Sequence, residues 1–209
     1  MGSSGTFRLP ILLLLSLLLG GCSPRGPFEE TLLERPDLAI YLQRASRGHY
    51  DHPQELRVEP LTEILTALRF APNRNGYPLF PRPVARKLAE AIAKGFKKAK
   101  PEELVSFVWV MPAPSFQERI TSGGAFVFDG ELHLVIANAN LLHATWQPDK
   151  AKPPSDLRPL EPMEPQRGRI SVEGPFVWRE VPTTLSAFRS VYYGDAPWHI
   201  AISLPQGER

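Results

Sequence analysis

The sequence predicts an α+β fold, in which one or two helices pack on a mostly antiparallel sheet. The turn pair Asp129-Gly130 joins two apolar stretches and predicts a β-hairpin over residues 123–140. Residues 104–111, LVSFVWVM, are almost entirely apolar and predict a strand buried in the middle of the sheet. Residues 84–99 repeat apolar side chains every four positions, which indicates an amphipathic helix.

The predicted hairpin has two different faces. Its turn places Val127 opposite Leu132, which gives one smoothly apolar face. Phe126 then lies opposite His133 on the second, more amphipathic face. A shift of one residue would exchange the two faces, so the position of the turn matters. Phe126 and His133 form a candidate pocket, in which His133 is either a general base or a half-buried packing residue.

The predicted helix has an apolar side and a basic side. Val84, Leu88, Ile92 and Phe96 recur on the apolar side. We interpret the basic side either as a solvated helix face or as a surface that binds anionic lipid headgroups or an acidic protein. Its cations are Arg86, Lys87, Lys94, Lys97 and Lys98.

The C-terminal part of the chain is divided by prolines, of which the whole chain has 23. Residues 147–168 are rich in proline and predict a long loop or a linker. Residues 169–181 and 198–204 are expected to be strands. We prefer a single domain over residues 49–209, because these last strands are too few to bury a core alone.

Composition excludes several classes of function. The formal charge of +2 is too small to indicate nucleic-acid binding. A single cysteine excludes an internal disulfide and a cysteine-based zinc cluster. The chain has no P-loop, no dinucleotide fingerprint and no G-x-S-x-G elbow. The sequence therefore gives little support for an enzyme, and no cofactor is expected.

Two further groups of polar residues have structural interpretations. His49, Asp51 and His52 are potential metal ligands within four residues, but a compact site needs ligands from elsewhere. They lie in a turn-like region, so we expect a solvated loop there. Asn138 and Asn140 follow an apolar strand and are interpreted as turn residues at its end.

The N-terminus has the three parts of an export signal. Arg8 precedes an apolar core at residues 9–19, and two glycines then lead to Cys22. The core has roughly half of the ~20 residues that a membrane-spanning helix needs. The stretch Leu19-Gly20-Gly21-Cys22 resembles the lipobox of bacterial lipoproteins. The resemblance implies that residues 1–21 are a cleaved signal peptide and that Cys22 carries a diacylglycerol at the new N-terminus.

The same resemblance implies a location. Two or more acyl chains hold a protein stably at a membrane. Ser23 after the cysteine implies transport to the outer membrane, with the folded part facing the periplasm. Residues 22–48 are expected to form the lipidated N-terminus and a tether that spaces the domain from the membrane.

Two functional hypotheses follow. The first is a non-catalytic envelope lipoprotein that binds a protein partner or helps to assemble an envelope complex. The second is a membrane-tethered hydrolase or small-ligand-binding protein with a pocket near the 123–140 hairpin. The second hypothesis requires one of the histidines to line an open pocket with a second titratable group in hydrogen-bond reach.

Overall fold

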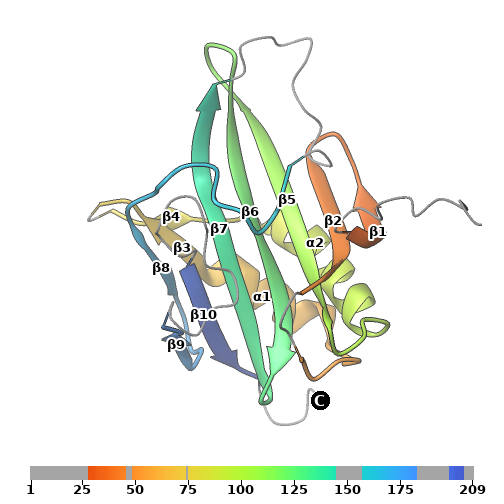
Figure 1. Cartoon of the computed structure of the whole chain (residues 1–209). Helices are drawn as coiled ribbons and strands as arrows, with labels where there is room; N and C mark the ends of the chain where they lie inside the picture. Colours follow the sequence, from red (N-terminus) through yellow and green to blue (C-terminus); the bar gives the residue numbers. More distant parts are fainter. Residues whose placement is uncertain (1–27, 46–48, 74, 145–156, 183–197, 205–209) are drawn as a thin grey trace, which may run out of the picture.

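A seven-stranded antiparallel sheet forms the centre of the structure (Figure 1). The computed structural model describes residues 28–45, 49–73, 75–144, 157–182 and 198–204. In spatial order the strands of this sheet are β1 (Phe28–Glu34), β2 (Leu38–Arg44), β5 (Glu103–Ala113), β6 (Gln117–Phe128), β7 (Glu131–Ala144), β10 (Trp198–Ser203) and β9 (Trp178–Glu180).

A second, smaller sheet lies beside the β10 end of the first (Figure 1). It contains three antiparallel strands in the order β4 (Tyr77–Pro78), β3 (Leu68–Ala71) and β8 (Arg169–Val172). The expected strand over residues 169–181 is thus two short strands, β8 and β9, in different sheets. Strands that follow the proline-rich stretch pair with strands that precede it, β8 with β3 and β10 with β7.

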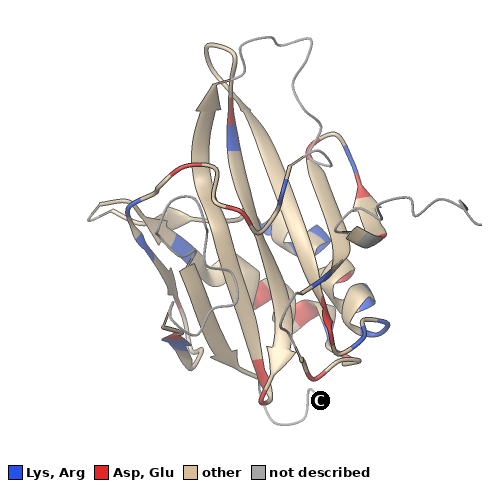
Figure 2. Ribbon diagram, in the orientation of Figure 1, with Lys and Arg blue, Asp and Glu red and all other residues tan. Residues whose placement is uncertain are grey.

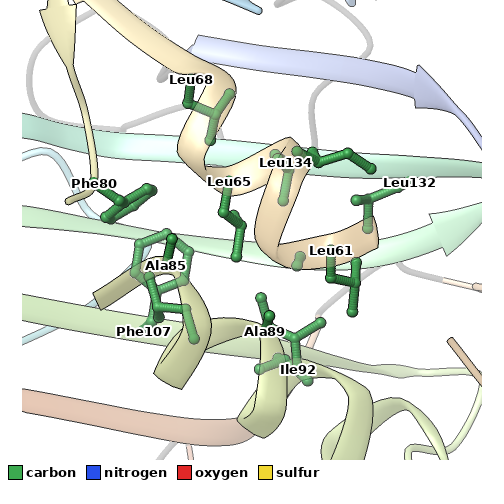
Figure 3. Packing of buried hydrophobic residues seen from close by; sticks show 14 of the residues in the cluster. Leu61, Leu65, Leu68, Phe80, Ala85, Ala89, Ile92, Phe107, Leu132 and Leu134 are labelled. Carbon is green, nitrogen blue, oxygen red and sulfur yellow. The ribbon is translucent and has the colours of Figure 1, made fainter. Parts of the chain in front are cut away.

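Two helices cover one face of the large sheet and bury the main core (Figure 3). They are α1 (Val58–Ala67) and α2 (Arg82–Phe96), so the helix predicted over residues 84–99 is confirmed with shifted ends. Pro83 falls in the first turn of α2, where a missing N–H costs little. Leu88, Ile92 and Phe96 are almost completely buried, and each stabilises the fold by roughly 2 kcal/mol.

The predicted hairpin is confirmed in its turn and its register. Val127 pairs with Leu132, and Phe126 pairs with His133. Asp129 and Gly130 have φ values of 52° and 71°, as a two-residue turn of the type I′ class requires. The prediction of a mostly antiparallel sheet with one or two helices is confirmed as well.

The tether expected over residues 22–48 is wrong for residues 28–44. Residues 28–44 form β1 and β2, and Ile40 in β2 is fully buried. Pro36 stands in the short connection between the two strands. Leu38–Leu42 are buried on both faces of the sheet, so they lack the alternation that identifies a half-buried strand.

An irregular segment at residues 157–168, called the strap below, crosses the sheet face opposite the helices (Figure 1). Leu160 packs in a cluster with Phe126, and Met163 packs against Ile120. A Cβ atom at Gly124 would lie 2.9 Å from Leu160 Cδ2, so glycine permits this close approach. The loop predicted over 147–168 is thus confirmed for the strap, and residues 147–156 lie outside the described part of the chain.

Candidate functional site

Two histidines from neighbouring strands meet on the strap side of the sheet. His133 belongs to β7 and His199 to β10, and His133 Nδ1 lies 3.0 Å from His199 Nε2. One of these nitrogens carries a hydrogen and donates a hydrogen bond to the other, so the rings form a hydrogen-bonded pair. The candidate pocket residue His133 therefore has a second titratable group within reach.

Aromatic rings pack against this histidine pair. Phe126 stacks on His133 with 4.9 Å between ring centroids, and Tyr50 stacks on Phe126 at 4.2 Å. The exposed fraction is 4% for His133, 6% for Phe126 and 7% for His199. The pair is packed inside the protein, and this burial keeps a substrate from reaching either ring.

Burial also sets the charge of the pair. Desolvation, together with the nearby His133 and Arg179, lowers the pKa of His199 to about 4. Desolvation lowers the pKa of His133 too, against the opposing effect of Glu131. Both rings are neutral at neutral pH. His133 Nε2 and His199 Nδ1 are buried without a hydrogen-bond partner. These unpaired nitrogens lower the stability of the folded protein, and protonation of either ring would lower it further.

The segment at residues 49–52 does not form a metal cluster. His49 is exposed, whereas the Asp51 carboxylate accepts a hydrogen bond from the Gly130 N–H at 3.1 Å. His52 is buried and its ring centroid lies 4.6 Å from that of Phe96. The expectation of a solvated loop is wrong for Tyr50 and His52. Among the described residues, no three metal-ligating side chains gather at one point.

The buried His52 has no polar partner. Both of its ring nitrogens lack a hydrogen bond. Desolvation lowers its pKa to about 4, while Asp51 and Glu103 act weakly in the opposite direction. This side chain is therefore an acid-sensitive point in the core.

Asn138 attaches the strap to the sheet. Its amide donates to Ser122 Oγ at 2.8 Å and to the Glu161 carbonyl at 3.0 Å. Its Oδ1 accepts the Met163 N–H at 2.9 Å. The interpretation of Asn138 as a turn residue at a strand end is wrong, because it is a buried residue within β7.

The basic side of α2 is partly neutralised by carboxylates (Figure 2). Arg86 pairs with Glu90 within the helix. Lys97 pairs with Glu55, and Lys98 pairs with Glu30 of β1. The five predicted cations and these three carboxylates together carry a charge of +2 rather than +5. The face is therefore less attractive to anionic surfaces than the sequence indicates.

The signal segment, Cys22 and Ser23 lie outside the described residues. Within the described part of the chain, neither helix is long and apolar enough to cross a bilayer. The chain matches no family model and no curated protein, and its structure matches no solved structure.

Sequence reasoning missed His199 as the partner of His133. The available signal was the alternation of β10, where Ile200 and Ile202 face the helices and His199 faces the strap side. That signal predicts on which face of the sheet His199 lies, but it does not predict which residue of the neighbouring strand lies beside it. The neighbour depends on the pairing of β10 with β7, between residues 66 positions apart.

Proposed function

We propose that this chain is a lipid-anchored bacterial envelope protein that binds a protein partner and catalyses no reaction. The observation that carries the proposal is the stretch Leu19-Gly20-Gly21-Cys22 at the end of an apolar segment. A diacylglycerol on Cys22, with a further acyl chain, supplies a durable membrane attachment. Ser23 favours the outer membrane, with the folded part in the periplasm.

The sheet begins only a few residues after Cys22, so the chain between the proposed lipid and the folded part is short. β1 begins at Phe28, and the chain from Cys22 to Phe28 spans at most about 20 Å when fully extended. The end of α2 packs beside β1, where Lys98 pairs with Glu30. The basic side of α2 is consequently close to the anchor, and its cations assist adhesion to anionic headgroups by about 1 kcal/mol each at most.

The packed histidine pair favours binding over catalysis. A hydrolase that used His133 would need an accessible ring, and the ring is 4% exposed. The strap and the stacked aromatic rings fill the space beside it.

Replacement of the lipid-bearing residue tests the proposal. In producing cells, Cys22→Ala is expected to abolish incorporation of labelled palmitate and to block signal cleavage. The matched control Ser23→Ala keeps the cysteine and is expected to remain processed and acylated. Ser23→Asp is expected to move the acylated protein from the outer to the inner membrane fraction. Normal processing and membrane retention of the Cys22→Ala protein would contradict the anchor.

A further inference from the structure

An irregular segment, residues 49–54, lies against the end of the large sheet at the hairpin turn and is called the clip below. Three of its backbone N–H groups donate to the end of α2, the connection between α2 and β5, and the end of β6. They are Gln54 to the Phe96 carbonyl at 2.9 Å, Tyr50 to the Pro101 carbonyl at 2.7 Å and Asp51 to the Val127 carbonyl at 2.8 Å. These bonds form no continuous ladder, so the clip can open without separating the strands of the sheet.

The clip takes part in a continuous row of six buried rings, three of which are histidines. In order, the row is Phe96, His52, Tyr50, Phe126, His133 and His199, with successive ring centroids 4.6, 6.0, 4.2, 4.9 and 5.1 Å apart. Each ring is at most 8% exposed. His52 and Tyr50 belong to the clip, so the clip connects a buried histidine of its own to the histidine pair on the sheet.

His52 has no place for an added proton while the clip is closed. Both of its ring nitrogens lack a hydrogen bond, and its ring packs on the fully buried Phe96. A charged imidazole needs acceptors or water at both nitrogens. Water reaches His52 only if the two rings separate. Phe96 is fixed within α2, whereas His52 lies in an irregular segment, so the clip is the part that moves.

The histidine pair at the other end of the row responds to acid in the same direction. In the neutral pair one hydrogen lies between His133 Nδ1 and His199 Nε2. A further proton on the facing nitrogens breaks this hydrogen bond. A further proton on an outer nitrogen creates a buried N–H without an acceptor, because both outer nitrogens lack a partner. Protonation therefore favours any conformation that admits water to the row.

Charged groups around the row do not compensate for its burial. Among the described residues, those that act on the three histidines are Asp51 of the clip, Glu103 of β5, Glu131 of β7 and Arg179 of β9. The carboxylates, together with the Phe128 backbone beside His133, raise the histidine pKa values, and Arg179 lowers those of the pair. Burial is the largest influence on each ring and keeps all three pKa values low. The row is consequently uncharged while it stays packed.

We propose that the clip opens in mild acid, when protons bind His52 and the histidine pair, while both sheets and both helices stay folded. Opening turns about Leu56, which is fixed in the main core. It lifts Tyr50 from Phe126 and uncovers the ring row from the side of the clip. The device is a pH-sensitive switch of the kind that buried histidine clusters provide. It uses only residues of the folded part and does not depend on the proposed anchor.

Amide hydrogen exchange of the purified chain between pH 7.5 and 5.0 tests the opening. The probes are the Tyr50, Asp51 and Gln54 amides, and the reference is the Phe107 amide in the middle of the large sheet. A pKa that rises from about 4 to 6.5 on opening makes opening of His52 about 30-fold more favourable at pH 5. With the pair added, the protection of the clip amides, corrected for intrinsic rates, is expected to fall at least about 100-fold.

Urea distinguishes opening of the clip from unfolding of the whole chain. At pH 5 the clip amides are expected to be less protected than the Phe107 amide and to be insensitive to low urea, because a local opening exposes little surface. The protection of Phe107 should decrease as urea is added. Equal protection and equal urea dependence of the clip and Phe107 amides would overturn the proposal, as would clip protection that does not change with pH.

Substitution of the histidines tests whether the row acts as one unit. His52→Leu is expected to make the fall in clip protection at least about tenfold smaller. The double variant His133→Gln/His199→Gln keeps polar side chains that do not titrate, and it should make the fall at least about threefold smaller. The matched control His49→Leu should leave the fall unchanged, because His49 is exposed. An unchanged fall in either histidine variant would overturn the proposal.

Circular dichroism at pH 7.5 checks that each variant is folded. If the double variant is not, proton NMR of the histidine rings in the parent chain replaces it. The His52, His133 and His199 signals are then expected to change over the same pH range in which the clip amides lose protection. Titration of the pair outside that range would show that the pair does not take part in the opening and would overturn the proposal.

Discussion

The buried His52 makes the stability of the protein dependent on pH in a way that one substitution removes. Its pKa is lowered from 6.5 to about 4 by burial. Above pH 6.5 both the folded and the unfolded states hold a neutral ring, so the histidine adds no pH dependence. As the pH falls from 6.5 toward 4, the unfolded state binds the proton first, and the free energy of unfolding decreases.

The expected loss is large enough to measure. Each pH unit between the two pKa values removes about 1.4 kcal/mol, so His52 costs about 2 kcal/mol at pH 5 and about 3 kcal/mol at pH 4. His52→Leu places an apolar side chain of similar size between Tyr50 and Phe96. This variant is expected to gain about 2 kcal/mol over the parent protein between pH 7.5 and pH 5.

Urea unfolding followed by tryptophan fluorescence at pH 7.5, 6.5, 5.5 and 5.0 measures this difference. Comparison of the variant with the parent at each pH cancels the titration of the carboxylates. His49→Leu is the matched control, because His49 belongs to the same segment and is exposed. A stability difference between His52→Leu and the parent that stays constant from pH 7.5 to 5.0 would refute the reasoning.

Three further predictions concern the strap, the hairpin and the basic side of α2. Asn138→Ala loses its three hydrogen bonds and should destabilise the protein by about 2–4 kcal/mol, with faster tryptic cleavage within the strap. Gly123→Ala should lower the free energy of unfolding by more than about 3 kcal/mol in a thermal unfolding experiment, because its Cβ would lie 2.0 Å from the Val135 carbonyl oxygen. The control Gly76→Ala, whose Cβ would have its nearest contact at 3.6 Å, should leave the stability nearly unchanged. Exchanging Lys87 and Lys94 for glutamine should lower the affinity of the purified chain for vesicles with anionic lipids by less than about 2 kcal/mol in sedimentation; a larger loss would show that the basic side dominates adhesion.

The elements that were predicted correctly are those that local chemistry determines. The Asp129-Gly130 turn sets its own backbone conformation, and the hairpin register follows from it. The helix at residues 84–99 is identified by its apolar repeat, although α2 begins at Arg82 and ends at Phe96. Neither prediction required knowledge of what else packs nearby.

The elements that were missed depend on distant contacts. β1 and β2 are stable only because β2 pairs with β5, and residues 103–109 lie far along the chain from residues 38–44. The proline-rich composition of the strap correctly predicts an irregular segment, but it does not show that Asn138 and Gln166 would hold the strap on the sheet. The same limit applies to His133 and His199, which strand pairing brings together.

The correction to the tether changes how the proposed anchor would hold the folded part of the chain. A flexible segment from Cys22 to residue 48 would let the domain turn freely above a membrane, whereas a sheet that starts at Phe28 leaves at most about 20 Å of chain. β1, Glu30 and the end of α2 are then held near the bilayer. The connection between β5 and β6 is about 30 Å away along β5, so that end of the sheet lies far from the proposed attachment.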